Sequence, residues 1–254
     1  MASELDDGLA YYDRGDFTSA FAVFKKASDN GNASAQTNLG VMYAKGQGVQ
    51  KDFISAAHWY SKAAMQGSLV AQANFGALYE LGQGVPQDYG KAIYWYSMAA
   101  KQGEPGAEYL LGQKYDTGRG VAQNFNQAIY WYKRSADQGY SLAQYNLGGM
   151  YYEGAGVPQD YAQALNWYLK AANQGHTDAQ NNTCILLSKE QGSKPNVVEA
   201  MKWAIIAEEN GHPEAKKSRL ALEKRMSFSQ LREANNLAAN WKAIIATKSN
   251  DLQR

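Results

Sequence analysis

Tryptophan spacing constrains the fold of this chain more than any other feature of its sequence. Five of the six tryptophans stand 36 residues apart, at Trp59, Trp95, Trp131, Trp167 and Trp203. Glycines and tyrosines keep the same step, as Gly40, Gly76, Gly112 and Gly148 and as Tyr43, Tyr79, Tyr115 and Tyr151. A period of about 20 to 50 residues indicates stacked units that bury their apolar faces only against neighbours. The chain is therefore predicted to form consecutive structural repeats.

Each 36-residue unit has the pattern of two helices. In the first half, Ala35, Leu39, Met42 and Tyr43 fall at helical spacing, with Gly40 where a facing helix can approach closely. In the second half an Ala-x-x-Trp-Tyr stripe recurs, as in residues 92–96. Residue types that cap helix N-termini precede this second helix, at Asp52, Asp88, Asn124, Asp160 and Asn196. Each unit is therefore expected to be a helix-turn-helix.

A Gly-x-Gly-Val loop is expected to join the two helices, at residues 46–49, 82–85, 118–121 and 154–157. Glycine suits this place because it adopts the positive φ that ends a helix. A dinucleotide-binding fingerprint would need a preceding strand and a further glycine, and the sequence has neither. These glycines therefore predict turns, and we expect no nucleotide cofactor.

These recurring residues resemble the Sel1-like repeat family, whose relatives are the tetratricopeptide repeats. The resemblance implies an all-α protein, a right-handed α-solenoid superhelix whose first helices line a concave groove while the second helices face outward. We expect an N-terminal tetratricopeptide-like capping repeat at residues 1–32 and C-terminal capping helices at residues 213–254. Five Sel1-like repeats are expected between them, at residues 33–68, 69–104, 105–140, 141–176 and 177–212.

The ends depart from the pattern. The step from Tyr11 to Tyr43 is 32 residues, so the first unit lacks four loop residues. In the fifth repeat Cys184 replaces the close-packing glycine, Leu187 replaces the tyrosine, and residues 190–195 replace the regular loop. Pro213 is then expected to open a further first-type helix. Residues 227–230 have capping-box spacing ahead of a final helix, which is expected to cover the open end.

Charge and hydropathy exclude several classes of partner. With 25 Lys and Arg against 24 Asp and Glu, the net charge of +1 gives no attraction to nucleic acid or an anionic membrane. No apolar run approaches the roughly 18 residues that a membrane-spanning helix needs. If Met1-Ala2-Ser3 replaces a signal peptide, we expect a location in the bacterial periplasm, and otherwise the cytoplasm.

Residues for catalysis or metal binding are scarce. The histidines are His58, His176 and His212, and the last two lie one repeat apart, so we interpret them as loop residues and not as ligands of one metal ion. Cys184 is the single cysteine, at a position where the repeat needs a small buried residue. We therefore expect no enzyme activity, no metal and no cofactor.

A partner-binding surface follows from the resemblance. In tetratricopeptide-type repeats, positions five, nine, twelve and thirteen of each first helix face the groove. Tyrosines there would be anchors because they combine large apolar area with a hydrogen-bonding tip; the alternative is that they serve repeat packing. Equivalent positions in the fifth repeat are Asn181, Ile185, Ser188 and Lys189. The candidate residues are Val41, Lys45, Glu80, Leu81, Tyr109, Gln113, Asp116, Tyr145, Tyr152 and Glu153.

A basic stretch from Lys216 to Arg225 is the densest cationic segment of the sequence. On a terminal helix it could contact an acidic partner or a phosphate group. The simpler interpretation is the solvated face of a capping helix.

These features favour a non-catalytic bacterial adaptor that binds another protein through the groove, as a monomer or in a complex with that partner. The resemblance also offers a periplasmic immunity protein that neutralises a secreted antibacterial toxin, such as a lipase effector, and the partner could equally be an envelope protein. A β-lactam-binding or cell-wall-acting enzyme is a further alternative, but that branch of the family has a cysteine pair in each repeat, which this chain lacks. A spacer without a ligand is the remaining alternative.

Overall fold

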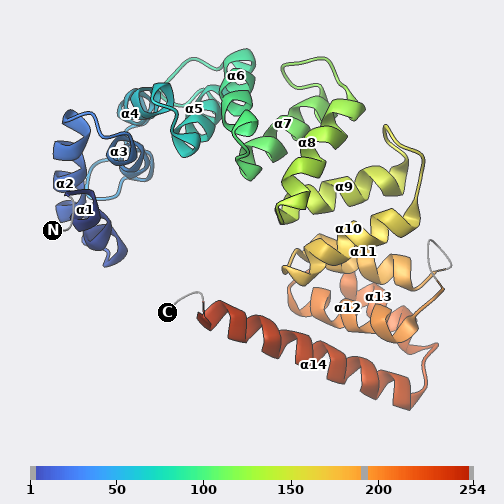
Figure 1. Cartoon of the computed structure of the whole chain (residues 1–254). Coiled ribbons are helices and arrows are strands. Elements are labelled where there is room, and N and C mark those ends of the chain that lie inside the picture. Colours follow the sequence, from blue (N-terminus) through green and yellow to red (C-terminus); the bar gives the residue numbers. More distant parts are fainter. Residues whose placement is uncertain (1–3, 190–193, 252–254) are drawn as a thin grey trace. The chain divides into compact units, whose positions relative to one another are not determined.

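The computed structural model describes residues 4–189 and 194–251, and over these residues it contains 14 α-helices and no strand (Figure 1). The predicted all-α solenoid of helix pairs is confirmed. None of the described helices is both long and apolar enough to cross a membrane. The helices are α1 (Glu4–Asp13), α2 (Phe17–Asp29), α3 (Ala33–Lys45), α4 (Phe53–Met65), α5 (Leu69–Leu81), α6 (Tyr89–Lys101), α7 (Pro105–Thr117), α8 (Phe125–Asp137), α9 (Ser141–Glu153), α10 (Tyr161–Asn173), α11 (Thr177–Leu187), α12 (Val197–Glu209), α13 (Ala215–Glu223) and α14 (Phe228–Asp251).

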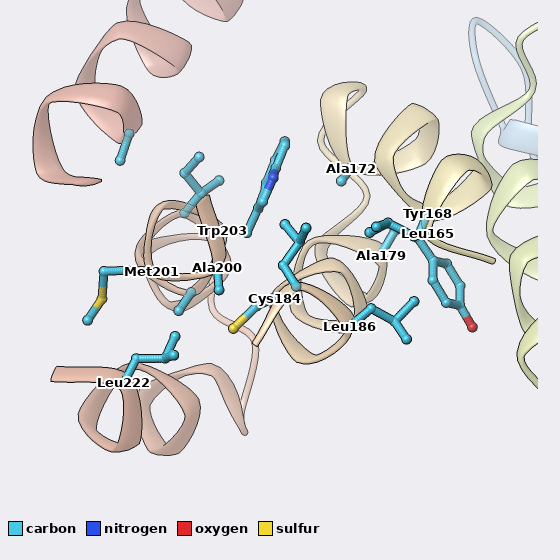
Figure 2. Close-up of a cluster of buried hydrophobic side chains, with 14 of the residues drawn as sticks. Leu165, Tyr168, Ala172, Ala179, Cys184, Leu186, Ala200, Met201, Trp203 and Leu222 are labelled. Atoms are coloured by element: carbon cyan, nitrogen blue, oxygen red, sulfur yellow. The ribbon is translucent and has the colours of Figure 1, made fainter. Parts of the chain in front are cut away.

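The helices form two compact units, unit 1 (Met1–Trp131) and unit 2 (Tyr132–Arg254). In unit 1 each helix from α1 to α6 packs against the next one in the chain. In unit 2 the same order holds from α9 to α12, and α12 also packs against α13 and α14. Figure 2 shows the main core of unit 2, where Trp203 and Cys184 lie among the side chains of α10, α11, α12 and α13. Sequence neighbours therefore supply the core, as expected of repeats.

Caps and glycine turns set the helix ends as the sequence predicts. The side chains of Asp52, Asp88, Asn124, Asp160 and Asn196 each accept a hydrogen bond from a backbone N–H in the first turn of the following helix. The first-type helices of four repeats end at glycines in the left-handed conformation, with φ between 67° and 76°, namely Gly46, Gly82, Gly118 and Gly154.

The recurring glycine in the middle of the first-type helix lets a tyrosine of the next helix pack directly on the helix backbone. A Cβ built on Gly40 would lie 2.6 Å from Cδ1 of Tyr60, and one on Gly148 would lie 2.7 Å from Cδ1 of Tyr168. In the fifth repeat Cys184 takes the place of the glycine, and Ala204 stands where the tyrosine would be. The two departures therefore compensate in size, an arrangement we call the size exchange: Cys184 is larger than the glycine it replaces, and Ala204 is smaller than the tyrosine it replaces.

We expect Gly40→Cys to lower the free energy of unfolding by about 2 kcal/mol, because the new side chain overlaps the Tyr60 ring. Combining it with Tyr60→Ala should cost at least about 1 kcal/mol less than the sum of the two single changes, since the pair then resembles Cys184 and Ala204. Urea unfolding of the four proteins measures this coupling. Strictly additive losses would contradict the size exchange.

The C-terminal helices follow the prediction with one shift. Helix α13 begins at Ala215, two residues after Pro213, because residues 213 and 214 form a turn in which the Glu214 N–H donates to Nδ1 of His212. The capping box is confirmed: Ser227 N–H donates to the Gln230 side chain at 2.9 Å, and Gln230 N–H donates to Oγ of Ser227 at 3.3 Å. Residues 190–193 of the irregular loop lie outside the described residues.

Candidate functional site

The candidate residue Glu80 in unit 1 is already engaged within the chain. Its Oε2 accepts a hydrogen bond from the Tyr96 hydroxyl at 3.0 Å, and its Oε1 pairs with Nζ of Lys114. Lys114 is 1% exposed, at a position where the other repeats carry Met42, Leu78, Met150 and Leu186. The carboxylate of Glu80 therefore stabilises the junction between the second and third repeats and is not free for a partner.

A departure at position six of the third repeat explains this ion pair. In unit 2, the amide of Asn146 donates to the hydroxyl of Tyr132 at 3.0 Å. The equivalent residue in the third repeat is Leu110, which has no polar atom for the Tyr96 hydroxyl. Glu80 is the partner of this hydroxyl instead, with the direction reversed: the Tyr96 hydroxyl donates to the carboxylate, and Lys114 balances its charge. Burial, followed by the charge of Glu80 and its hydrogen bond, raises the pKa of Tyr96.

The other candidate residues of unit 1 lie on three helices. Lys45 on α3 and Leu81 on α5 are exposed, and Val41 is half-buried. On α7 the structure brings two candidates together, since the Gln113 amide donates to the Tyr109 hydroxyl at 3.4 Å. Asp116, also on α7, is half-buried, and its carbonyl accepts from the Gln123 side chain.

In unit 2 the candidate tyrosines are held in place by other rings. Tyr145 stacks on His176 with ring centroids 4.5 Å apart, and its other neighbour is Tyr168 at 5.7 Å. Tyr152 meets Tyr161 edge to face at 5.4 Å. Both candidates remain half-buried, and Glu153 beside them is exposed. These tyrosines therefore combine a packing role with a surface that a partner can reach.

Two adjoining cavities lie along the first helices of unit 2. The smaller, about 100 Å³, is lined by Tyr152, Tyr168, Asn182 and Ile185. The larger, about 280 Å³, is lined by four residues at the end of α11 and four from α13 and the turn after it: Cys184, Ile185, Ser188, Lys189, Ser218, Ala221, Leu222 and Arg225. Ile185 belongs to both. Four of the positions predicted to face the groove, Tyr152, Ile185, Ser188 and Lys189, therefore line these hollows, whereas Asn181 is buried.

Sequence reasoning missed the contribution of α13 to this surface and a third cavity. That cavity, about 530 Å³, lies between the second half of α14 and the repeat ends, and its lining includes Trp241, Ile245 and Thr177. The signal for the α13 contribution was the basic stretch from Lys216 to Arg225, whose last residue lines the 280 Å³ cavity.

His176 caps the N-terminus of α11, and His212 holds the turn that precedes α13. Nδ1 of His176 accepts from the N–H of Ala179 at 3.3 Å, and Nδ1 of His212 accepts from Glu214 N–H at 3.2 Å. His58 is exposed beside Trp59. Among the described residues, no group of three or more His, Cys, Asp or Glu side chains lies close enough to hold a metal ion. Burial raises the pKa of Cys184 to about 12, so its thiol stays protonated near neutral pH.

The His176 cap predicts acid sensitivity. Burial lowers the pKa of His176, an effect partly offset by the charge of Asp178, and a protonated Nδ1 could not accept the hydrogen bond from Ala179. The unfolded chain therefore binds a proton before the folded one does, and stability falls as the pH drops below about 6.5 towards the depressed folded-state pKa. Urea unfolding at several pH values should show a smaller loss for His176→Asn, which caps without titrating. Equal losses in both proteins would exclude this role.

Comparison with known proteins identifies the family. The sequence profile of the Sel1 repeat matches residues 33–68, 69–104, 105–140, 141–176 and 177–212. The chain is a Sel1-repeat protein. Its structure is similar to that of a Sel1 repeat protein from Oxalobacter formigenes, with a TM-score of 0.80 and 32% identity over 93% of this chain and 99% of that one.

Two further structures are similar to this Sel1-repeat protein. One is c5321, a protective antigen of uropathogenic Escherichia coli, with a TM-score of 0.62 and 33% identity over 96% of this chain and 61% of that one. The other is the immunity protein Pa5087 from Pseudomonas aeruginosa, with a TM-score of 0.53 and 22% identity over 80% of this chain and 82% of that one. At that identity the second likeness concerns the fold alone. No curated protein matches the sequence.

Proposed function

We propose that this Sel1-repeat protein is a non-catalytic scaffold that binds another protein through its first-helix face, defined as positions five, nine, twelve and thirteen of the first helix in each repeat, with the exception of Glu80. The observation that carries the proposal is in unit 2, where Tyr152, Ile185, Ser188 and Lys189 from these positions line two adjoining cavities. Other positions of the same helices, such as Ala143, Leu147 and Met150, are buried in the repeat core.

The residues of this face suit protein recognition. Tyr145 and Tyr152 offer both an apolar ring and a hydroxyl, and their contacts with His176 and Tyr161 restrict their rotamers before a partner binds. Such preorganisation reduces the entropy lost on association. In unit 1, Lys45 and Leu81 add exposed basic and apolar side chains. A mixed surface of this kind supports binding of a protein.

The test is capture of a partner from cytosolic and envelope fractions of the source cell. Wild type should retain a protein that the Tyr109→Ala/Tyr145→Ala/Tyr152→Ala variant loses. The matched control is Tyr94→Ala/Tyr130→Ala, which removes exposed tyrosines from the second-type helices α6 and α8. Circular dichroism verifies that all three proteins are folded. A partner lost only by the control, or held equally by all three proteins, would contradict the proposal.

A narrower version is that the partner is a toxin and this Sel1-repeat protein is the corresponding immunity protein, in the periplasm. Support comes from structures of the same fold, since Pa5087 and PA5088 from Pseudomonas aeruginosa are both described as immunity proteins. The expected result is that equimolar protein abolishes the toxicity of the captured partner in co-expressing cells. If the captured partner stays fully toxic although it is bound to this protein, the immunity proposal is wrong and the scaffold proposal is unaffected.

The non-catalytic part of the proposal has its own test. We expect neither turnover nor acylation when the protein is incubated with β-lactams or peptidoglycan fragments. Turnover that the purified wild-type protein sustains would contradict it.

A further inference from the structure

The 280 Å³ cavity of unit 2 combines an apolar floor with a cationic rim. Leu222 is 3% exposed, and Ile185 beside it is half-buried. Lys189 and Arg225 are exposed at the rim, one following α11 and the other following α13, and Ser188 and Ser218 add hydroxyl groups. The cavity can therefore hold an apolar side chain and an anion next to each other.

The two rim cations differ from their basic neighbour on α13. Arg219 pairs with Glu208 at 2.5 Å and with Glu223 at 3.0 Å, so its charge is balanced within the chain. Among the residues that the structure describes, Lys189 and Arg225 take part in no ion pair. An unbalanced positive charge beside a partly desolvated cavity favours a carboxylate from a partner.

We propose that this cavity binds an acidic segment of the partner polypeptide. A carboxylate of the segment lies between Lys189 and Arg225, and an aliphatic side chain packs against Ile185 and Leu222. The volume, near the lower end of ligand pockets, suits one aliphatic side chain with its neighbouring carboxylate. The inference rests on the proposed function, because Ile185, Ser188 and Lys189 belong to the first-helix face.

The spacing of the recognised residues follows from strand geometry. In an extended peptide, residues i and i+2 point to the same side, whereas residues i and i+1 point to opposite sides. A carboxylate and an aliphatic side chain that enter one compact cavity should therefore be two positions apart in the partner sequence.

Fluorescence anisotropy at low salt with two dye-labelled peptides tests the inference. The first is Glu-Ser-Leu-Ser-Glu-Ser-Leu-Ser, with acid and leucine two positions apart; the second, Glu-Leu-Ser-Ser-Glu-Leu-Ser-Ser, has the same composition with them adjacent. Wild type should bind the first at least about fivefold more tightly. The Lys189→Glu/Arg225→Glu variant should bind the first peptide at least about tenfold more weakly, because both cations that would pair with its carboxylate become anions.

Two control variants make the result specific to the cavity. Lys216→Glu/Arg232→Glu changes the net charge equally at exposed residues that do not line the cavity, and it should alter the affinity by no more than about twofold. Ala221→Phe fills the cavity from an exposed position without removing either cation and should abolish binding.

Three results would overturn the inference: absence of peptide binding, equal affinities for the two peptides, or equal losses in the two charge-reversal variants. The partner captured in the previous experiment separates this inference from the proposed function. If the tyrosine variant loses that partner while Lys189→Glu/Arg225→Glu keeps it, the scaffold function stands and the cavity inference fails. If no partner is captured but peptide binding depends on the cavity as described, the preference of the cavity for an acidic segment stands and the scaffold function fails.

Discussion

Lys114→Leu is expected to lower the free energy of unfolding by about 3 kcal/mol, because it leaves the Glu80 carboxylate unpaired inside unit 1. The side chains of Lys114 and Glu80 are only 2% and 14% exposed, so water can replace little of the lost interaction. By the repeat pattern alone the change would count as conservative, since Leu78 and Leu186 occupy the same position. Urea unfolding at neutral pH measures the loss.

A triple variant is the matched control. Leu110→Asn/Glu80→Ala/Lys114→Leu gives this junction the residues found between the first two repeats, namely Asn74, Ala44 and Leu78. We expect it to lie within about 1 kcal/mol of wild type, because replacing a whole buried ion pair by apolar groups is often neutral or stabilising. A nearly neutral single change, or a triple variant as unstable as the single one, would show that the ion pair does not have this role.

Gly84→Ala is expected to cost about 3 kcal/mol or more. A Cβ on Gly84 would lie 2.0 Å from the carbonyl oxygen of Phe53 at the start of α4, and the residue has a φ of 68°. Both the backbone contact and the left-handed conformation oppose any side chain there. The loop of the second repeat is thereby fixed to the second helix of the first repeat.

Gly67→Ala separates the two effects. Gly67 also has a positive φ, 90°, but a Cβ there would meet nothing within 4 Å. Its loss should be about 1 to 2 kcal/mol, from backbone conformation alone. Thermal or urea unfolding of the two variants side by side gives the comparison. If both lose the same stability, the backbone contact at Gly84 contributes nothing.

The fold was readable from the sequence because its determinants are local and repeated. The step between Trp59 and Trp95, the caps at Asp52 and Asp88 and the glycine at Gly46 each specify a feature within one repeat. The start of α13 was misplaced by two residues because residues 213 and 214 form a turn, held by the hydrogen bond from the Glu214 N–H to Nδ1 of His212, and no side chain caps α13 itself.

The candidate site was readable only in part. Tyr152 and Lys189, at positions counted from the repeat, line cavities, and their role in binding a partner stays a prediction. This counting could not show that Glu80 is engaged, since its partner Lys114 lies 34 residues away, at a position where the other repeats carry methionine or leucine. Ser218 and Arg225 were not assigned to the cavity because α13 follows the last repeat and lacks the periodic residues from which positions are counted.

Titration calorimetry with the captured partner tests the scaffold function most directly. The first-helix face predicts that Tyr109→Ala/Tyr145→Ala/Tyr152→Ala raises the Kd at least about 30-fold, the equivalent of about 2 kcal/mol for one anchor residue. The control Tyr94→Ala/Tyr130→Ala should change it by less than about threefold. A Kd that rises with the control and not with the first-helix variant would place the interface on the second-type helices and contradict the proposed function.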